Sequence, residues 1–235
     1  MRYLLIITTL SIFLTSCNKK TEHFYISFGG FTQGTTYSIT YSSKDSINYK
    51  NQIENLLAEF DSSLSTYNKL SVISKINYNE SNVTDKYFRT VYKKACDVYN
   101  KTDHAFDITV APLVNAWGFG FSNKENITNA VIDSILEFVG FDKVCIRDSI
   151  IIKSDKRIML DVNAIAQGYS VDLVTDFLEN NGITDYLVEI GGELKTKGVN
   201  SKGKAWKIGI DKPFDNNNVP GANLQAIISL SNKSL

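Results

Sequence analysis

Residues 161–199 read DVNAIAQGYSVDLVTDFLENNGITDYLVEIGGELKTKGV, and this stretch decides the fold class. Its first part predicts a helix over about 163–182, because apolar residues recur there at helical spacing. Its second part predicts two strands, 186–190 and 193–199, joined by a tight turn at Gly191-Gly192. A helix followed directly by an antiparallel hairpin favours an α+β arrangement over strict alternation of strand and helix.

The chain on either side of this stretch carries the same two patterns. Helical spacing recurs at 53–64, 84–100 and 131–139, and Gly140 is expected to end the third of these helices. Strand patterns recur at 35–41, 144–146, 150–152, 206–210 and 225–230. We therefore predict the α+β class: a single domain in which helices pack on an antiparallel sheet.

Composition and charge exclude some classes of function. The 235 residues are 43% apolar and 21% charged, and the formal net charge is zero. A chain of this size buries about 70% of its unfolded surface, so it can build a core without cross-links. The zero net charge, without long runs of one sign, argues against a nucleic-acid partner.

The N-terminus resembles an export signal followed by a lipidation site. Met1-Arg2 is positive, residues 4–14 are apolar, and Leu14-Thr15-Ser16-Cys17 resembles a bacterial lipobox. We expect residues 1–16 to be a signal peptide, 17–32 a linker from a lipid anchor on Cys17, and 33–235 the folded domain. That places the protein on the extracytoplasmic side of a bacterial membrane. The alternative is a plain signal peptide with an incidental cysteine.

The remaining cysteines and histidines limit the choice of metal. Cys96 falls in a helical pattern and Cys145 in a strand pattern, so two separate core thiols are favoured over a disulfide, although export would permit one. Two histidines and no C-x-x-C spacing provide no soft-metal site. Any metal is expected to be a hard cation held by oxygen atoms.

Four segments carry polar or aromatic residues that apolar patterning does not explain. In residues 102–113, Asp107 lies between Phe106 and Ile108, and it is either a ligand contact or a turn or helix-capping aspartate. As a ligand contact on a polar loop, its replacement would leave the fold largely intact. Residues 63–68 place Tyr67 at a polar helix exit, where its ring could stack on a flat ligand.

The other two segments come from the opening stretch. Asp161 precedes the predicted helix, whose first N–H groups favour an anion such as phosphate; it is otherwise a helix cap. Gly168 lies inside that helix, which costs about 1 kcal/mol relative to alanine unless something packs closely there. Residues 188–193 are either part of a site or a simple hairpin turn.

Taken in order, these segments are specific. They read GTTY (34–37), STYN (65–68), HAFDITVAPLVNAWGFG (104–120), DVNAIAQGY (161–169) and VEIGGE (188–193). This series resembles the ApbE-type FAD:protein FMN transferases over roughly residues 33–213. The resemblance implies a T-fold-like α+β domain with FAD in an extended cleft and Mg²⁺ at the pyrophosphate. It also implies transfer of FMN to a threonine of an exported protein, such as a membrane redox complex subunit, with release of AMP.

The resemblance also implies roles for individual residues. Those expected to contact FAD are Gln33, Tyr67, Ala105, Phe106, Asp107, Asp161 and Gln167, with Tyr67 against the isoalloxazine ring. Ala164 is expected to give its backbone carbonyl to Mg²⁺. Three positions depart from the family pattern: Gln33 stands where methionine is frequent, His104 replaces a glycine, and Gln167 replaces a lysine, which removes a positive charge near the phosphates.

The family's H-x-x-D-P-x-T-G segment, which completes the magnesium ligands, does not occur in residues 1–235. We therefore expect a domain that is incomplete at its C-terminus, with no catalytic residue assigned, that binds FAD but shows little Mg²⁺-dependent transfer as given. Two alternatives stay open: an FAD pyrophosphatase, in which water replaces the threonine, and a non-catalytic FAD-binding lipoprotein.

Overall fold

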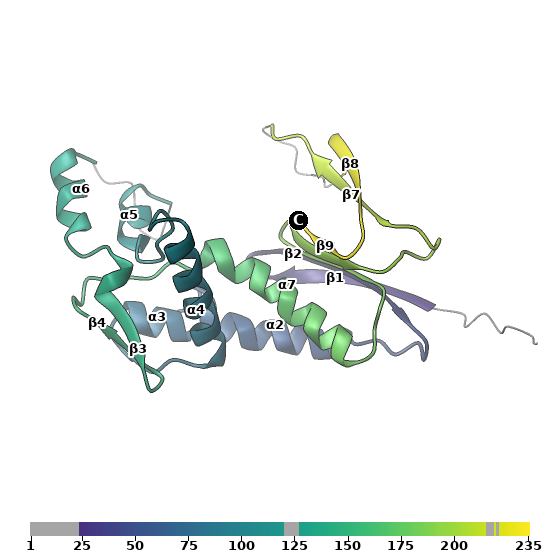
Figure 1. Cartoon of the computed structure of the whole chain (residues 1–235), viewed down its shortest axis with the longest axis horizontal. Helices are drawn as coiled ribbons and strands as arrows, with labels where there is room; N and C mark the ends of the chain where they lie inside the picture. The colour runs from purple at the N-terminus through teal and green to yellow at the C-terminus, as the bar shows by residue number, and fades with distance from the viewer. Residues whose placement is uncertain (1–23, 120–126, 215–218, 220) are drawn as a thin grey trace, which may run out of the picture.

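A five-stranded antiparallel sheet forms the centre of the computed structural model, which describes residues 24–119, 127–214, 219 and 221–235 (Figure 1). Its strands lie in the order β1 (Phe24–Thr32), β2 (Thr35–Ser43), β5 (Tyr186–Ile190), β6 (Glu193–Lys197) and β9 (Lys233–Ser234). The β5–β6 hairpin pairs Ile190 with Glu193 across Gly191-Gly192, where both glycines have positive φ. The predicted α+β class, with helices on an antiparallel sheet, is confirmed.

Strand β1 corrects the expected boundary of the folded domain. We expected residues 17–32 to be a linker, but Phe24–Thr32 pair with β2 along their whole length. The pairing is stabilised on both faces, because Phe28 packs against Tyr37 and Tyr41 on one side, and Tyr25 packs against Trp206 on the other. Interspersed serine and glycine residues hide this alternation in the sequence. The predicted signal peptide and Cys17 lie outside the described residues.

Helices α2 (Lys50–Leu64) and α7 (Asn163–Asn180) cover one face of the sheet. The buried core between them consists of Tyr37, Ile39, Tyr41, Ile53, Leu57, Val171, Val174, Leu178, Ile183, Tyr186, Val188 and Ile190. The opposite face packs against a two-stranded ribbon of β7 (Trp206–Asp211) and β8 (Leu224–Leu230), through Leu194, Trp206 and Ile208. The sheet is therefore covered on both sides near its middle.

A second core lies at one end of the molecule (Figure 1). The elements around it are α3 (Val72–Asn77), α4 (Lys86–Lys101), α5 (Ala111–Ala116), α6 (Asn129–Leu136), η2 (Phe141–Lys143), β3 (Val144–Arg147) and β4 (Ile150–Lys153). Phe60 and Leu64 at the end of α2 and Ala166 in α7 belong to this core. The two long helices therefore join the sheet to the second core.

Several elements differ from the sequence predictions. The helices α3 and α5 were not predicted, because six residues make fewer than two helical turns, and the two residues of β9 are too few to show a strand pattern. The third predicted helix ends at Leu136 instead of continuing to 139, and none of the residues of α6 is fully buried. Gly140 begins η2 instead of ending α6, with φ of 150°. No helix among the described residues is long and apolar enough to cross a membrane.

The two thiols of the described chain are separate and free, as predicted, but both are half-buried and not fully in the core. Cys96 lies in α4 and Cys145 in β3, and each belongs to an element that packs into the second core.

Asn77, the last residue of α3, links that helix to the segment that leads into α7. Its side-chain Nδ2 donates to the carbonyl of Leu160 at 2.9 Å, and its Oδ1 accepts from the N–H of Leu160 at 2.8 Å. Both residues are buried, with Asn77 only 7% exposed. Water does not reach these buried groups, so without Asn77 the N–H and the carbonyl of Leu160 would have no hydrogen-bond partner. The Asn77 amide supplies one acceptor and one donor for them.

We expect Asn77→Ala to lower the free energy of unfolding by about 2–4 kcal/mol, because it leaves a buried N–H and a buried carbonyl unpaired. Urea titration followed by tryptophan fluorescence measures this change. Asn55→Ala, on the exposed side of α2, is the matched control and should be neutral or slightly stabilising. Equal stability of the two variants would contradict the proposed link.

Candidate functional site

Three adjoining hollows, which we call the Tyr67 cleft, meet at Tyr67. The first, about 870 Å³, lies between the β1–β2 turn and α2. The second, about 270 Å³, lies between the end of α2 and the start of α7, and shares Gln33, Asp61 and Tyr67 with the first. The third, about 50 Å³, is lined by residues of α3 and α5 and by Asp161. Their summed extent suits an elongated ligand.

The Tyr67 cleft brings together four of the predicted contact residues, which are far apart in the sequence. Gln33 lines the first and second hollows, Gln167 the second, Asp161 the third, and Tyr67 all three. Ala105, Phe106, Asp107 and Ala164 line none of them. The structure thus groups half of the predicted residues and leaves the other half beside the cleft.

Tyr67 presents an exposed ring on a tightly bonded loop. Its side chain is 73% exposed, although Leu64, three residues earlier at the end of α2, is buried. The N–H of Ser65 donates to Asp61 O at 3.1 Å, and the hydroxyl of Ser71 donates to Ser65 O at 2.7 Å. These bonds end α2 and hold the loop against α3. An aromatic face held in this way offers a stacking surface for a flat ring.

Asp161 joins the third motif to the fourth. Its N–H donates to the carbonyl of Ile108 at 2.7 Å, and Val110 forms a parallel bridge with Met159. Its Oδ1 accepts from the N–H of Asn163, the first residue of α7, at 2.8 Å. The N-cap of α7 is Val162, which makes no side-chain cap bond, so Asp161 is not the helix cap. Its carboxylate instead accepts from the first N–H of the helix and also lines the third hollow.

Asp107 is a turn residue in this structure. Its Oδ1 accepts from the N–H and the hydroxyl of Thr109 at 2.8 and 2.7 Å, and its Oδ2 accepts from the N–H of Phe141 at 2.8 Å. The hydroxyl oxygen of Thr109 in turn accepts from the N–H of Gly140 at 2.7 Å. These three bonds argue against the expectation that the fold does not depend on this carboxylate. Contact of Asp107 with FAD stays a prediction.

The remaining predicted residues lie next to the cleft. Ala105 is exposed, and Phe106 packs against the second core. Ala164, the second residue of α7, is exposed, so its carbonyl lies in the first turn beside Asp161. Gly168 was expected to allow close packing, but a Cβ at this position would lie 3.8 Å from its nearest neighbour, Glu193 Oε2, which is an ordinary contact.

Gly191, rather than Gly168, is the glycine that the site requires. A Cβ at Gly191 would overlap the side-chain Nε2 of Gln167 and lie 2.7 Å from Thr35 Cγ2. Gly191 also has φ of 58°, and its N–H donates to Thr36 O at 3.0 Å. The β5–β6 turn therefore leaves the space in which the Gln167 amide lies.

The Tyr67 cleft has carboxylates but no cationic side chain. Glu54, Asp61 and Asp161 line it, whereas none of the described lining residues is lysine or arginine. Tyr37 donates to Glu54 Oε1 at 2.7 Å, and burial raises the pKa of Asp61, partly opposed by a hydrogen bond from Ser65. A bound polyphosphate would therefore need a cation from solution.

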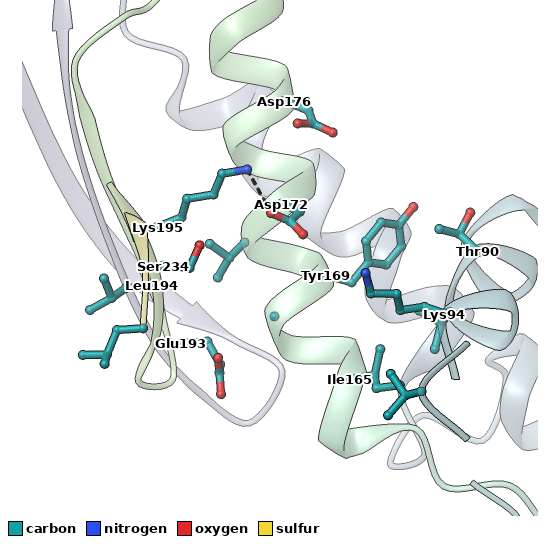
Figure 2. A pocket seen from close by; sticks show the side chains of 15 residues that line it. Thr90, Lys94, Ile165, Tyr169, Asp172, Asp176, Glu193, Leu194, Lys195 and Ser234 are labelled. Atoms are coloured by element: carbon teal, nitrogen blue, oxygen red, sulfur yellow. Dashed lines mark hydrogen bonds and ion pairs between the residues drawn. The ribbon is translucent and has the colours of Figure 1, made fainter. Parts of the chain in front are cut away.

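A separate hollow of about 790 Å³ lies between α4, α7 and strands β6 and β9 of the sheet. Figure 2 shows the apolar Ile165 and Leu194 in it, with the ion pair of Lys195 Nζ and Asp172 Oδ1 at 3.0 Å on its rim. It contains none of the predicted contact residues. The convergence of the motifs, and not the volume of a hollow, makes the Tyr67 cleft the candidate site.

The family model described as the ApbE family matches residues 33–235. The chain belongs to the ApbE family. It is 35% identical over 222 residues to the FAD:protein FMN transferase of Vibrio cholerae and 32% identical over 246 residues to that of Haemophilus influenzae. These alignments cover 91% and 98% of this chain, but 66% and 70% of those proteins. The chain thus spans about two thirds of the curated relatives it matches.

The structural comparison agrees with the ApbE family assignment. The solved structure of the flavin transferase ApbE from Vibrio cholerae superimposes with a TM-score of 0.79 at 32% identity, covering 91% of this chain and 71% of that one. The sequence resemblance to this family, drawn from five short motifs, is confirmed.

Sequence reasoning missed several residues of this ApbE-family cleft. Asp61 lines two hollows and Asn77 lines the third. Asp61 follows Phe60 on α2 and resembles any polar residue beside an apolar helix face. Asn77 has the clearer signal, since a buried asparagine after an apolar run needs partners for both ends of its amide.

We expect Asp107→Ala to destabilise the chain by about 2–3 kcal/mol, because it removes the acceptor of three hydrogen bonds in a partly buried loop. Asp97→Ala, on the exposed side of α4, is the control and should cost about 0.5 kcal/mol or less. Chemical denaturation of both variants measures the difference. Normal stability combined with weakened FAD binding would instead identify Asp107 as a ligand contact.

Proposed function

We propose that this chain carries the FAD-binding part of an enzyme that transfers FMN from FAD to a threonine of another protein. The supporting observation is the convergence of Gln33, Tyr67, Asp161 and Gln167 on one cleft, in a chain whose relatives are named FAD:protein FMN transferases. In the reaction, the threonine oxygen bonds to the phosphorus of FMN, the bond from that phosphorus to AMP breaks, and the hydroxyl proton is released.

The residues of the cleft have distinct tasks under this proposal. The exposed ring of Tyr67 stacks on the isoalloxazine, and the end of FAD that carries phosphate points toward the start of α7. There the first N–H groups of an 18-residue helix favour negative charge, and Asp161 holds the first of them, that of Asn163, in place. Gln167 contacts the phosphates as a neutral donor.

Mg²⁺ belongs to the same proposal. A hard dication prefers about six oxygen ligands, and it often keeps waters and takes substrate phosphates as ligands. The described residues contain no cluster of three or more His, Cys, Asp or Glu side chains that could hold a metal. The Ala164 carbonyl therefore fits the ion only together with oxygens from outside these residues, such as the FAD pyrophosphate. Bound Mg²⁺ would neutralise charge on the pyrophosphate during transfer.

The acceptor is proposed to be an exported protein, such as a subunit of a membrane redox complex. A chain anchored outside the cytoplasm meets only exported substrates.

The function is tested by incubating the purified chain with FAD, MgCl₂ and a candidate exported acceptor, with EDTA in a parallel sample. Binding is followed by quenching of flavin fluorescence, and transfer by in-gel flavin fluorescence of the acceptor. We expect FAD to bind, and Asp161→Ala to weaken binding by about tenfold, because the start of α7 loses the bond between Asn163 and Asp161 that orders it. Asp133→Ala, on exposed α6, is the control.

Each outcome of this experiment identifies one of the three possible functions. Covalent flavin on the acceptor that disappears with EDTA supports the transferase. Free FMN with AMP indicates a pyrophosphatase, and tight FAD binding with no product indicates a binding module. Failure to bind FAD would contradict all three.

The proposed location is a lipid anchor on Cys17, on the extracytoplasmic side of a bacterial membrane. Cys17→Ser removes the thiol that would be acylated, so this variant should move from the membrane to the soluble fraction after cell fractionation. Cys96→Ser is the control and should stay with the membrane. Continued membrane association of the Cys17 variant would disprove the anchor.

A further inference from the structure

Gln33 holds a buried polar atom without a partner. Its side-chain Nε2 is shielded from solvent and makes no hydrogen bond with any described residue. Gln33 lies in the β1–β2 turn with φ of 51° and lines both the first and the second hollow of the Tyr67 cleft. A buried donor without an acceptor is costly, so it suggests that a ligand supplies the missing partner.

The other end of this carboxamide, Oε1, makes only a long contact. Oε1 lies 3.5 Å from the hydroxyl oxygen of Ser170, which is fully buried. That hydroxyl has one hydrogen, and it already donates to the carbonyl of Gln167 at 2.7 Å. Rotating the amide by 180° lets Nε2 donate to Ser170 and places Oε1 at the unpartnered position. In either orientation one end of the amide lacks a partner among the described residues, so a ligand in the cleft would reach it after a rotation of the Gln33 side chain.

We propose that the Gln33 carboxamide hydrogen-bonds the imide edge of the flavin ring and thereby determines selectivity for that edge. The inference rests on the proposed function. The imide edge carries an N–H between two carbonyl groups, so it can pair with either end of a carboxamide. Tyr67 lines the same two hollows as Gln33, so a ring stacked on Tyr67 would share these hollows with the carboxamide.

The adenine ring of FAD could pair with the Gln33 carboxamide in place of the flavin, since the edge of adenine also has a hydrogen-bond donor beside an acceptor. Two observations favour the flavin. The first hollow, at about 870 Å³, is the largest part of the cleft and suits a three-ring system. Asp161 and the start of α7, where the phosphates are proposed to lie, border the third hollow at the other end. FMN contains only the flavin ring and ADP only the adenine ring, so measuring the binding of each distinguishes the two possibilities.

The test compares wild type with Gln33→Met, which keeps the length of the side chain and removes its hydrogen-bonding groups. Fluorescence quenching gives the affinity for FMN and for 3-methyl-FMN, in which the imide N–H is blocked, and calorimetry gives the affinity for ADP. We expect Gln33→Met to weaken FMN binding about fivefold to tenfold while leaving ADP binding unchanged. Thermal stability of the free chain should not fall, because the variant removes an unpaired buried group.

The analogue provides the decisive comparison. Wild type should bind 3-methyl-FMN several times more weakly than FMN, and Gln33→Met should bind the two about equally. Gln52→Met, on the exposed side of α2, should behave as wild type. The same preference for FMN in wild type and Gln33→Met would overturn the inference, as would a loss confined to ADP. If wild type binds none of FAD, FMN and ADP, the proposed function itself is contradicted.

Discussion

The hydrogen bond from the N–H of Asp161 to the carbonyl of Ile108, at 2.7 Å, joins the two halves of the molecule at the candidate site. On one side of it lies the loop that Asp107 ties to Phe141, and on the other lies the start of α7. Asn77 holds the same crossing point through both backbone groups of Leu160. Because these bonds are buried or partly buried, displacing one of them would disturb the loop and the helix start together. The position of Asp161 in the cleft is therefore a property of the fold.

The charge of the Tyr67 cleft constrains its chemistry. Its lining contains three carboxylates and the neutral amides of Gln33 and Gln167, and no cationic side chain among the described residues. A pyrophosphate entering such a site meets like charge, so favourable binding requires either helix N–H groups or a divalent cation. The cleft of this chain is thus expected to depend on a co-bound cation more strongly than a site with a lysine at position 167.

Much of this could be predicted from sequence, and the failures have physical causes. The hairpin at 186–197 was predicted because alternation and a Gly-Gly turn agree, and the motifs identified four residues that do meet in space. Strand β1 was missed because Ser27, Gly29 and Gly30 interrupt an alternation that only cross-strand partners reveal. Asp107 is structurally important because it accepts from the N–H of Phe141, and Gly191 because the side chain of Gln167 lies against it. Such pairs are set by tertiary contacts, which local patterns do not contain.

The topology of the sheet has a consequence for the order of folding. Strand β2 pairs with β1 on one side and with β5 on the other. Strands β2 and β5 are far apart in the sequence, as the pairing of Tyr41 with Tyr186 shows. The β1–β2 hairpin can form early from local contacts, but the pairing with β5 closes a very long loop and so belongs to a slow step. Until then the edge of β2 that later pairs with β5 is open, and the apolar face of the hairpin is incompletely covered. A newly made chain therefore passes through a state prone to self-association, and a chaperone that shields this hairpin would increase the yield of native protein.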